Sequence, residues 1–259
     1  SGDGDGIYFH EWYDVGYYME DDAHFEMGNL EVMRNDITAL AGCGIYWYYF
    51  EDVAYYMGNS NPGYTTFIMG DILFSDNTLV CKYEGISLYC FEYIGYEMYG
   101  ESYAQFGDFQ VCRNDINSTG DDGIYLHDWY EWGYDMYDGA EAVFGDVLVN
   151  DNTIIAGNET NADADGIYMY EWYDMGSFMY DTSKATFGNF EMCRNDITAT
   201  DDGIYIGDIE DLAYYNYDSS VAYYGDFLFN GNVIVSGLDG DGYGFYNDYF
   251  EYIGYYLYG

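Results

Sequence analysis

Apolar, small and polar positions recur along this chain with a period of roughly 40 residues. One recurring stretch, segment A, opens with a glycine that is followed by an aliphatic residue or Phe. A large apolar residue stands six positions after the glycine, and a small residue ten positions after it. A repeat of this length predicts a solenoid of stacked coils. Segment A opens at Gly6, Gly44, Gly85, Gly123, Gly166, Gly203 and Gly244.

A second stretch, segment B, follows every segment A except the last and spans Gly28 to Ile37 in the first unit. Its apolar residues alternate with polar ones, as at Leu30 and Val32, and β-branched and aromatic residues dominate both segments. This pattern predicts β-strands and no helix. The apolar positions of segment A change parity between its third and sixth residues, which predicts a bulge or corner. Segment B opens at Gly28, Gly70, Gly107, Gly145, Gly188 and Gly225.

Equivalent strands of successive units are expected to stack about 4.8 Å apart. We therefore predict an all-β fold, a parallel β-solenoid of seven repeats of which the last is partial, and a single domain over residues 1–259. Forty residues per turn allow either a three-sided β-helix or a flattened coil with two facing sheets. The length of a unit varies at only two positions, both of them predicted loops. The clearest examples are residues 59–63 and 157–165.

Stacking in register places equivalent side chains above one another, so that they form ladders. An asparagine stands seven residues after each segment B glycine, and the sixth position of segment A forms an aromatic ladder. A third ladder, of tyrosines from Tyr17 to Tyr255, is interrupted at Ser177. The asparagine ladder contains Asn35, Asn77, Asn114, Asn152, Asn195 and Asn232. The aromatic ladder contains Trp12, Phe50, Phe91, Trp129, Trp172 and Phe250.

The composition adds an acidic coat to this scaffold. There are 48 acidic and 5 basic residues, and the net charge is −43. Nucleic acid is excluded as a partner because too few cations are present to neutralise phosphates, whereas binding of cations is favoured. The chain has no run of 18 apolar residues and so no predicted membrane span. The first residue is Ser, which fits a mature exported protein at the cell surface.

Two sequons, at Asn117 and Asn158, fall in predicted loops and favour export and glycosylation. The five cysteines form an odd set, so at least one thiol is free or paired with another molecule. An intermolecular disulfide is therefore a candidate function of this set, which comprises Cys43, Cys81, Cys90, Cys112 and Cys193.

Carboxylates supply the candidate metal sites. Each segment A has at least one at its seventh or eighth position, such as Glu51, Glu131 and Asp174, and these should bind cations or have raised pKa values. Residues 161–166 match the first half of a calcium loop, but Trp172 occupies the place of its bidentate Glu. A site for Ca²⁺ or another divalent cation at the turns between coils remains a candidate, and no other cofactor is expected. Its candidate ligands are Asp3, Asp5, Asp163, Asp165, Asp239 and Asp241.

Catalysis is not predicted, because no nucleophile and base can be brought together. Arg34, Arg113 and Arg194 recur at one position in alternate units, and we expect them to pair with Asp36, Asp115 and Asp196 or with a neighbouring subunit. A lyase would instead need one basic residue in a unique acidic cleft. The histidines, His10, His24 and His127, are expected to be surface residues.

The phrases Asn195–Tyr205 and Asp151–Ile155 resemble the Asn-x-Ile and Gly-Ile-Tyr coils of right-handed parallel β-helix proteins of the pectate-lyase-like superfamily. The tyrosine-rich, acidic form of the repeat is similar to secreted repeat proteins of methanogenic archaea, among them the proteins of the tubular cell sheath. This resemblance covers essentially the whole chain. It implies a parallel β-helix and a place in extracellular surface material, and says little about function, since the superfamily also includes enzymes and adhesins.

These observations together predict a structural subunit of an extracellular sheath, fibre or surface layer. Both terminal units keep the repeat pattern in place of a polar cap, so the partner is expected to be another copy of the chain, end to end and laterally. One difficulty is that a joint would set segment A against segment A unless the register shifts. The alternatives are a polysaccharide-active β-helix enzyme and a calcium-dependent adhesion module.

Overall fold

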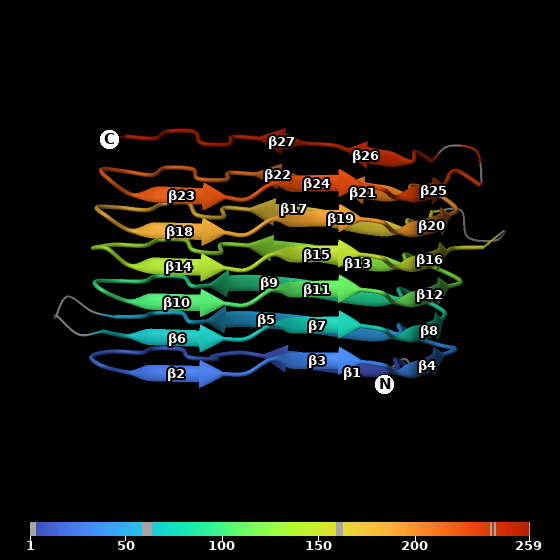
Figure 1. Ribbon diagram of the computed structural model, residues 1–259, viewed down its shortest axis with the longest axis horizontal. Coiled ribbons are helices and arrows are strands. Elements are labelled where there is room, and N and C mark those ends of the chain that lie inside the picture. The colour runs from blue at the N-terminus through green and yellow to red at the C-terminus, as the bar shows by residue number, and fades with distance from the viewer. Residues whose placement is uncertain (1–3, 59–63, 159–162, 239, 241, 259) are drawn as a thin grey trace.

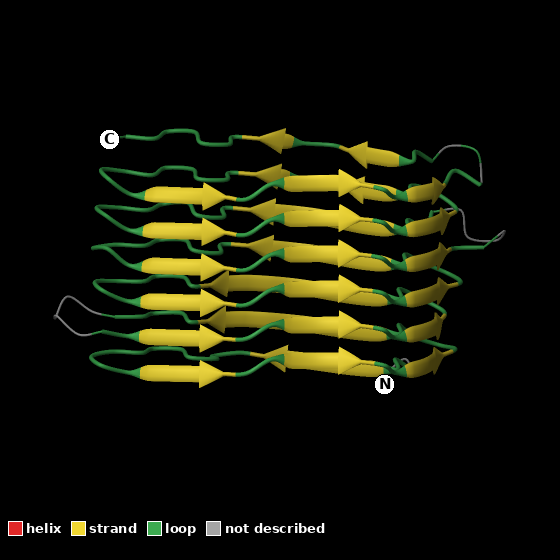
Figure 2. Ribbon diagram, viewed as in Figure 1, coloured by secondary structure: helices red, strands yellow, loops and turns green. Residues whose placement is uncertain are grey.

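The computed structural model describes the chain apart from residues 1–3, 59–63, 159–162, 239, 241 and 259. Its described residues form strands, turns and loops, with no helix among them, and the all-β prediction is confirmed (Figure 2). That part of the chain accordingly holds no helix able to cross a membrane. The first loop site, residues 59–63, and the candidate ligands Asp3, Asp239 and Asp241 lie outside the described residues.

The strands stack into a parallel β-solenoid of six full coils and a seventh that holds only β26 and β27 (Figure 1). Each full coil adds one rung to each of four parallel sheets, here called sheets 1 to 4. Sheets 2 and 3 lie side by side on the near face of Figure 1, with sheet 1 behind them and sheet 4 at one end. The cross-section therefore corresponds to the flattened coil, with one end closed by a short fourth sheet.

Sheet 1 is formed by segment A and has nine strands, because coil six and coil seven each supply two short ones. Its strands are β1 Ile7–Trp12, β5 Ile45–Val53, β9 Ile86–Ile94, β13 Ile124–Tyr130, β17 Ile167–Tyr173, β21 Ile204–Ile206, β22 Ile209–Glu210, β26 Phe245–Asn247 and β27 Phe250–Glu251.

Sheets 2, 3 and 4 each have six strands, and segment B supplies sheets 3 and 4. Sheet 2 contains β2 His24–Met27, β6 Thr66–Met69, β10 Tyr103–Phe106, β14 Glu141–Phe144, β18 Lys184–Phe187 and β23 Val221–Tyr224. Sheet 3 contains β3 Leu30–Met33, β7 Ile72–Ser75, β11 Phe109–Cys112, β15 Val147–Asn150, β19 Phe190–Cys193 and β24 Phe227–Asn230. Sheet 4 contains β4 Asp36–Ala39, β8 Thr78–Cys81, β12 Asp115–Ser118, β16 Thr153–Ala156, β20 Asp196–Ala199 and β25 Val233–Val235.

Equivalent positions pair in register throughout, as in Ile86 with Ile124 on sheet 1. The glycine that opens segment A is required by this close stacking. A Cβ on Gly85 would lie 2.2 Å from Cγ2 of Ile116 and 2.4 Å from the carbonyl oxygen of Gly123 in the next coil. Any side chain at this position would therefore push two coils apart, which explains why the repeat opens with glycine.

The parity change in segment A is produced by one residue with a left-handed backbone. The residue five positions after the glycine has a positive φ in the three central coils: 57° at Cys90, 58° at Asp128 and 60° at Glu171. This kink lets Leu126 and Trp129, three residues apart, both point into the core, where each is 0% exposed. The predicted bulge is confirmed in these coils.

The interior is filled by stacked rings. In the predicted aromatic ladder the ring centroids of Phe50 and Phe91 lie 5.2 Å apart, those of Phe91 and Trp129 5.1 Å, and those of Trp129 and Trp172 5.4 Å. A second ladder, not predicted from the sequence, crosses sheet 2 with centroid distances of 4.8–5.3 Å. Its members are Phe25, Phe67, Phe106, Phe144, Phe187 and Tyr224.

The asparagine ladder is confirmed and lies at the turn between sheets 3 and 4. Both the backbone N–H and the side-chain amide of Asn77 donate to Oδ1 of Asn114, at 3.1 and 3.0 Å. Asn114 in turn donates to Oδ1 of Asn152, and its amide also donates to the carbonyl oxygen of Phe74. The buried amides thus accept the backbone N–H of the turn and add a hydrogen bond to a carbonyl of sheet 3.

A second turn ladder has the opposite direction. The residue after each segment B glycine is Asn or Asp, and its Oδ1 accepts the backbone N–H of the equivalent residue in the next coil. Asp108 N donates to Asp71 at 2.9 Å, for example, and Asp146 N donates to Asp108 at 2.9 Å. In the asparagine ladder each side-chain oxygen accepts from the preceding coil, and in the second ladder each accepts from the following coil. The two ladders lie at opposite ends of the sheet 3 strands and together fix the register there.

Removing a central rung of the asparagine ladder should destabilise the whole stack. Asn114→Ala leaves the buried N–H of Asn77 without its acceptor and removes the amide that donates to the carbonyl of Phe74, and we expect a loss of about 2–4 kcal/mol in unfolding free energy. Asn35→Ala is the matched control, because that rung is half-buried and only donates to Asn77; its cost should be about 1 kcal/mol or less. Urea unfolding followed by circular dichroism measures both, and equal losses would contradict a cooperative ladder.

Candidate functional site

The C-terminal end of the stack exposes side chains that the same positions bury elsewhere. Phe245 is 45% exposed and Phe250 48%, although Ile204 and Ile209, directly below them, are 1% and 2% exposed. Phe229 is 39% exposed on sheet 3, where Met192 below it is 0% exposed. This end of the described chain is therefore a section through the apolar core.

The seventh coil covers sheet 1 only, so sheets 2, 3 and 4 end one coil lower (Figure 1). The end has a step, with β26 and β27 above it and β23, β24 and β25 along its lower part. Asp226 and Asn232, the last members of the two turn ladders, lie on that lower part. Another coil of this repeat would continue both ladders there.

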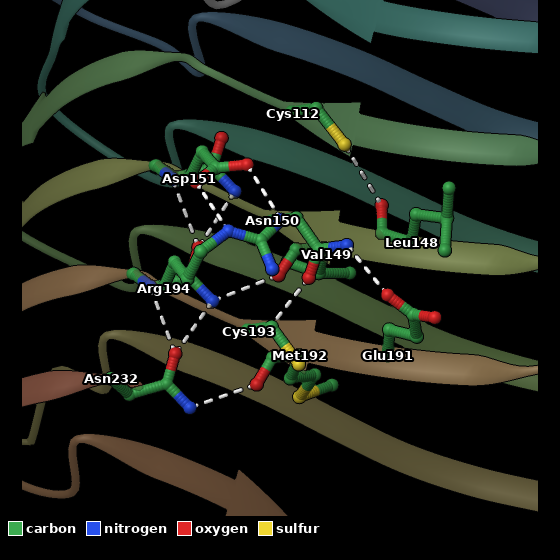
Figure 3. Close-up of polar contacts among 12 residues, drawn as sticks. Cys112, Leu148, Val149, Asn150, Asp151, Glu191, Met192, Cys193, Arg194 and Asn232 are labelled. Atoms are coloured by element: carbon green, nitrogen blue, oxygen red, sulfur yellow. Dashed lines mark hydrogen bonds and ion pairs between the residues drawn. The ribbon is translucent and has the colours of Figure 1, made fainter. Parts of the chain in front are cut away.

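A ladder of alternating charge runs along the turn between sheets 3 and 4, and Figure 3 shows its pair of Arg194 and Asp151. Nε and Nη2 of Arg194 both donate to the carboxylate of Asp151 at 2.8 Å, and Arg113 binds Asp76 in the same way at 2.8 and 3.0 Å. These hydrogen bonds hold the pKa values of Asp76 and Asp151 below their usual range. The predicted pairing with Asp115 and Asp196 is wrong for Arg113 and Arg194.

The reason lies in the turn geometry. The alternating position places Arg34, Asp76, Arg113, Asp151 and Arg194 one above another, all with φ between 57° and 59°. A guanidinium therefore reaches the carboxylate of the coil below more easily than the aspartate two residues ahead in its own coil, at the start of the next strand. The side chains are about half exposed, so each pair contributes little stability and acts mainly to fix register and cancel charge.

The acidic ladder of segment A ranges from exposed at its two ends, at Asp14 and Glu251, to half-buried or buried in the central coils, where Glu92 is 6% exposed. Burial first, and repulsion from Glu92 and Asp52, raises the pKa of Glu51 to about 7. Burial and the charge of Asp174 raise the pKa of Glu131 to about 7, and Oε2 of Glu131 is buried without a hydrogen-bond partner among the described residues. Burial raises the pKa of Asp174 to about 7 as well. Raised pKa values were one of the two outcomes predicted for this ladder.

Three groups of side chains could hold a cation, since their ligand atoms lie within 4.8 Å of one another. The one at the turn before sheet 1 is nearest to the predicted calcium sites, and it contains Asp165 with Asp201 and Asp202. Asp163 is exposed and does not belong to it. The other two groups are Glu51, Cys90 and Glu92, and His127, Asp128 and Glu171.

Asp165 also forms hydrogen bonds that link successive coils. Its N–H donates to Oδ1 of Asp122 at 2.7 Å, and its own Oδ1 accepts the N–H of Asp202 at 2.8 Å. Asp5 does the same for the N–H of Cys43 at 2.8 Å. Burial raises the pKa of Asp165 to about 7, so a cation would relieve a real electrostatic cost. Calcium binding stays a prediction, now centred on Asp165, Asp201 and Asp202.

His127 is not the surface residue that was expected. Its side chain is 17% exposed, its Nδ1 lies 2.9 Å from Oδ1 of Asp128, and its ring stacks on Tyr89 at a centroid distance of 5.2 Å. His10 and His24 are exposed as predicted. The difference follows from coil position, because His127 has coils on both sides whereas the other two lie in the first coil.

All five cysteines are buried as free thiols, with exposed fractions of 2–8%. Burial and the carboxylate of Glu84, whose Oε2 accepts a hydrogen bond from Cys43 at 2.9 Å, raise the pKa of the Cys43 thiol. Burial likewise raises the pKa of Cys81 to about 12. A disulfide to another molecule would therefore require the coil to open locally, and it stays a prediction.

The two sequons lie in different surroundings. Asn117 is part of β12, where it pairs with Val80 and Ile155, so the loop predicted for it is wrong. The polar residues around Asn117 are typical of a loop in the sequence, but pairing with strands of both neighbouring coils makes this segment a strand. Asn158 is exposed at the edge of a longer connection, and its amide donates to the carbonyl of Thr119. Glycosylation at either residue stays a prediction.

The sequence held two signals that were not used. The residue after every segment B glycine is Asn or Asp, which marks the second turn ladder. Six positions after that glycine the chain reads Arg, Asp, Arg, Asp, Arg and Gly, which marks the alternating charge ladder. Both patterns are visible only when equivalent residues are compared down the coils instead of along the chain.

Comparisons with protein-family models, with curated proteins and with solved structures gave no match. The fold is that of a parallel β-helix repeat protein, whereas the resemblance to the pectate-lyase-like superfamily and to archaeal sheath proteins stays an interpretation of the sequence.

Stability should rise as the pH falls from about 8 to about 5.5, because Glu51, Glu131 and Asp174 bind protons more tightly folded than unfolded. The stabilisation is lost as pH rises through the folded pKa of about 7. The lowered pKa values of Asp76 and Asp151 act only in more acidic solution. Melting temperatures across this range measure the slope, and Glu131→Gln should raise the value at high pH and flatten the slope. A melting temperature that falls on acidification toward pH 6 would contradict the prediction.

Calcium should raise the melting temperature through the group at Asp165. Asp165→Asn keeps the Oδ1 acceptor for Asp202 but removes a buried charge, so we expect a higher melting temperature than wild type in chelator and a smaller gain with Ca²⁺. At about 100 times Kd the gain for wild type would be about 2.7 kcal/mol. Asp163→Asn is the matched control, and an equal loss of the calcium effect there would favour the site first predicted.

Proposed function

We propose that this chain is a structural subunit of an extracellular sheath, fibre or surface layer, which assembles with copies of itself by coil-on-coil stacking. The observation that supports the proposal best is the exposed core at the C-terminal end, where Phe229, Phe245 and Phe250 are 39%, 45% and 48% exposed. Apolar surface of this kind is stabilised when another surface covers it. A coil of the same repeat has the matching strands and ladders.

The first coil offers a complementary surface. Ile7, Phe9 and Trp12 are only partly buried there, whereas Ile45, Trp47 and Phe50 in the next coil are at most 1% exposed. The step left by the half coil means that a second copy, or a further segment B, must fill the lower part before stacking is continuous. The sequence raised the same difficulty, because direct stacking of two copies would set segment A of one against segment A of the other.

The net charge of −43 opposes association, and cations bound near the acidic ladders would oppose that repulsion. Assembly should therefore depend on ionic conditions, with divalent cations more effective than monovalent ones. Localisation outside the cell is part of the proposal and rests on the sequence pattern and the resemblance alone.

The enzyme alternative has less support. Cavities of about 470 and 580 Å³ are lined largely by acidic residues and tyrosines and one of about 250 Å³ mainly by small and apolar residues, and no Lys or Arg of the described residues lines any of the three. A lyase of the expected kind would place a basic residue at the centre of its acidic cleft. The adhesion module depends on the calcium test described above.

Assembly can be tested on the purified chain by light scattering and negative-stain microscopy over a range of concentration, with Ca²⁺, with chelator and with reductant. We expect fibres or sheets whose formation needs cations and is lost in Phe250→Lys and Phe229→Lys, since each places a charge on the exposed core. Ile155→Lys is the matched control, because Ile155 is 46% exposed on β16 in the fourth coil, away from both ends of the stack.

The control should assemble as wild type does. A wild-type chain that stays monomeric under all these conditions would overturn the proposal, as would unchanged assembly of both end variants. Circular dichroism and melting curves of each variant establish that loss of assembly does not reflect unfolding.

A further inference from the structure

One histidine takes the place of a tyrosine on the outer side of sheet 1. Four positions after the segment A glycine, coils two to five carry Tyr48, Tyr89, His127 and Tyr170. The imidazole of His127 stacks on the ring of Tyr89 in the preceding coil, with centroids 5.2 Å apart, and lies 5.3 Å from the ring of Tyr170 in the following coil. The ring of Tyr125 stacks on it as well, at 5.3 Å. Three aromatic rings therefore hold the imidazole in place, and the side chain is only 17% exposed.

Two carboxyl groups lie beside this imidazole. Asp128 is the next residue of β13, and Glu171 is the equivalent residue of β17 in the following coil. Both have the left-handed backbone of the bulge. Because of this kink His127 and Asp128 both lie on the outer side of the strand, whereas a regular strand would send adjacent side chains to opposite faces. An imidazole nitrogen and one oxygen of each carboxylate consequently lie within 4.8 Å of one another, and they come from two successive coils.

The nitrogen nearest the carboxylates lacks a partner. Nδ1 of His127 is enclosed by the protein and makes no well-directed hydrogen bond with any described residue, although Oδ1 of Asp128 lies 2.9 Å from it. Two donor atoms that bind one ion at about 2.1 Å each, and at a right angle, lie about 3.0 Å apart. The observed separation therefore suits a shared ion. The other oxygen of Asp128, Oδ2, accepts a hydrogen bond from the thiol of Cys90 at 3.6 Å, which keeps Oδ1 toward the imidazole.

The first coil offers a natural comparison. His10 occupies the same position of the repeat, and its Nδ1 lies 3.3 Å from Oε1 of Glu11, but the two side chains are 59% and 40% exposed. The residue that pairs with Glu11 in the next coil is Tyr49, which supplies no second carboxylate. A histidine beside an acid is thus common to both coils, whereas the enclosed nitrogen and the second acid are found only at His127 among these two.

We propose that His127, Asp128 and Glu171 bind one divalent transition-metal ion of the Zn²⁺ type, through an imidazole nitrogen and one oxygen from each carboxylate. An imidazole nitrogen is a good ligand for Zn²⁺ and its neighbours in the transition series, whereas Ca²⁺ takes about six to eight oxygen ligands. The site therefore differs in its chemistry from the turn group at Asp165. It joins the fourth and fifth coils, away from both ends of the stack, so it is independent of the proposed assembly.

The test uses the full chain, freed of metal by a chelator and then kept in excess Ca²⁺ so that the acidic coat is already occupied. Isothermal titration should show one Zn²⁺ bound per chain under these conditions, and binding should raise the melting temperature. Co²⁺ should bind the same site and give the visible absorption of nitrogen and oxygen ligands, without a thiolate charge-transfer band. A thiolate band would place the ion at Cys90, and absence of saturable Zn²⁺ binding would leave only an ion pair of His127 and Asp128. Either result would overturn the proposal.

Two variants and a matched control locate the ion. His127→Tyr inserts the residue of the neighbouring coils, so it should keep the fold, as melting in chelator will show, and weaken Zn²⁺ binding at least about tenfold. Glu171→Gln should weaken binding by a similar factor, and it provides the test if the tyrosine variant does not fold. His10→Tyr makes the same change at the exposed histidine and should bind Zn²⁺ as wild type does. Unchanged Zn²⁺ affinity in both site variants, or an equal loss in His10→Tyr, would overturn the proposal.

Discussion

Coil-on-coil register is the constraint on which this molecule depends. Parallel strands fix it only along the sheets, so the turns need their own restraint. Two amide and carboxylate ladders supply it, one through Asn77, Asn114 and Asn152 and the other through Asp71, Asp108 and Asp146. Their opposite directions resist a shift of the coil either way. Because equivalent residues lie directly above one another, the ladders of rings and of charges follow from the same register.

The same register creates the electrostatic problem of the fold. A carboxylate at one position of the repeat is placed near its copies in the next coils, and partial burial reduces the screening of their charges by water. The chain reduces this cost in three ways. Backbone N–H groups donate to Asp165 and Asp122, arginines alternate with aspartates at the turn of sheets 3 and 4, and the most crowded acids have pKa values near neutrality. The remaining charge favours cations as partners.

Departures from the repeat are where specific chemistry can arise. At Ser87 the tyrosine ladder of sheet 1 lacks one ring, and at Phe250 the apolar core is 48% exposed where the equivalent Ile209 is 2% exposed. At both places the pattern of the other coils is incomplete, and the proposed stacking of a second copy would cover Phe250. Positions that obey the repeat, such as Trp129 and Asn114, are closed to partners because their neighbours already occupy them.

The sequence by itself determined the fold class, because a forty-residue period with alternating apolar residues leaves few ways to bury them other than stacked strands. It also identified the asparagine and aromatic ladders, whose members are identical or similar in most coils. Only the tertiary structure decided which groups meet across coils. Arg194 binds Asp151 instead of Asp196, His127 is covered where His10 is not, and Asn117 lies in a strand. The physical reason is that neighbours along the chain are separated by the pleat and by turns, whereas residues about 40 positions apart lie a single strand spacing from one another.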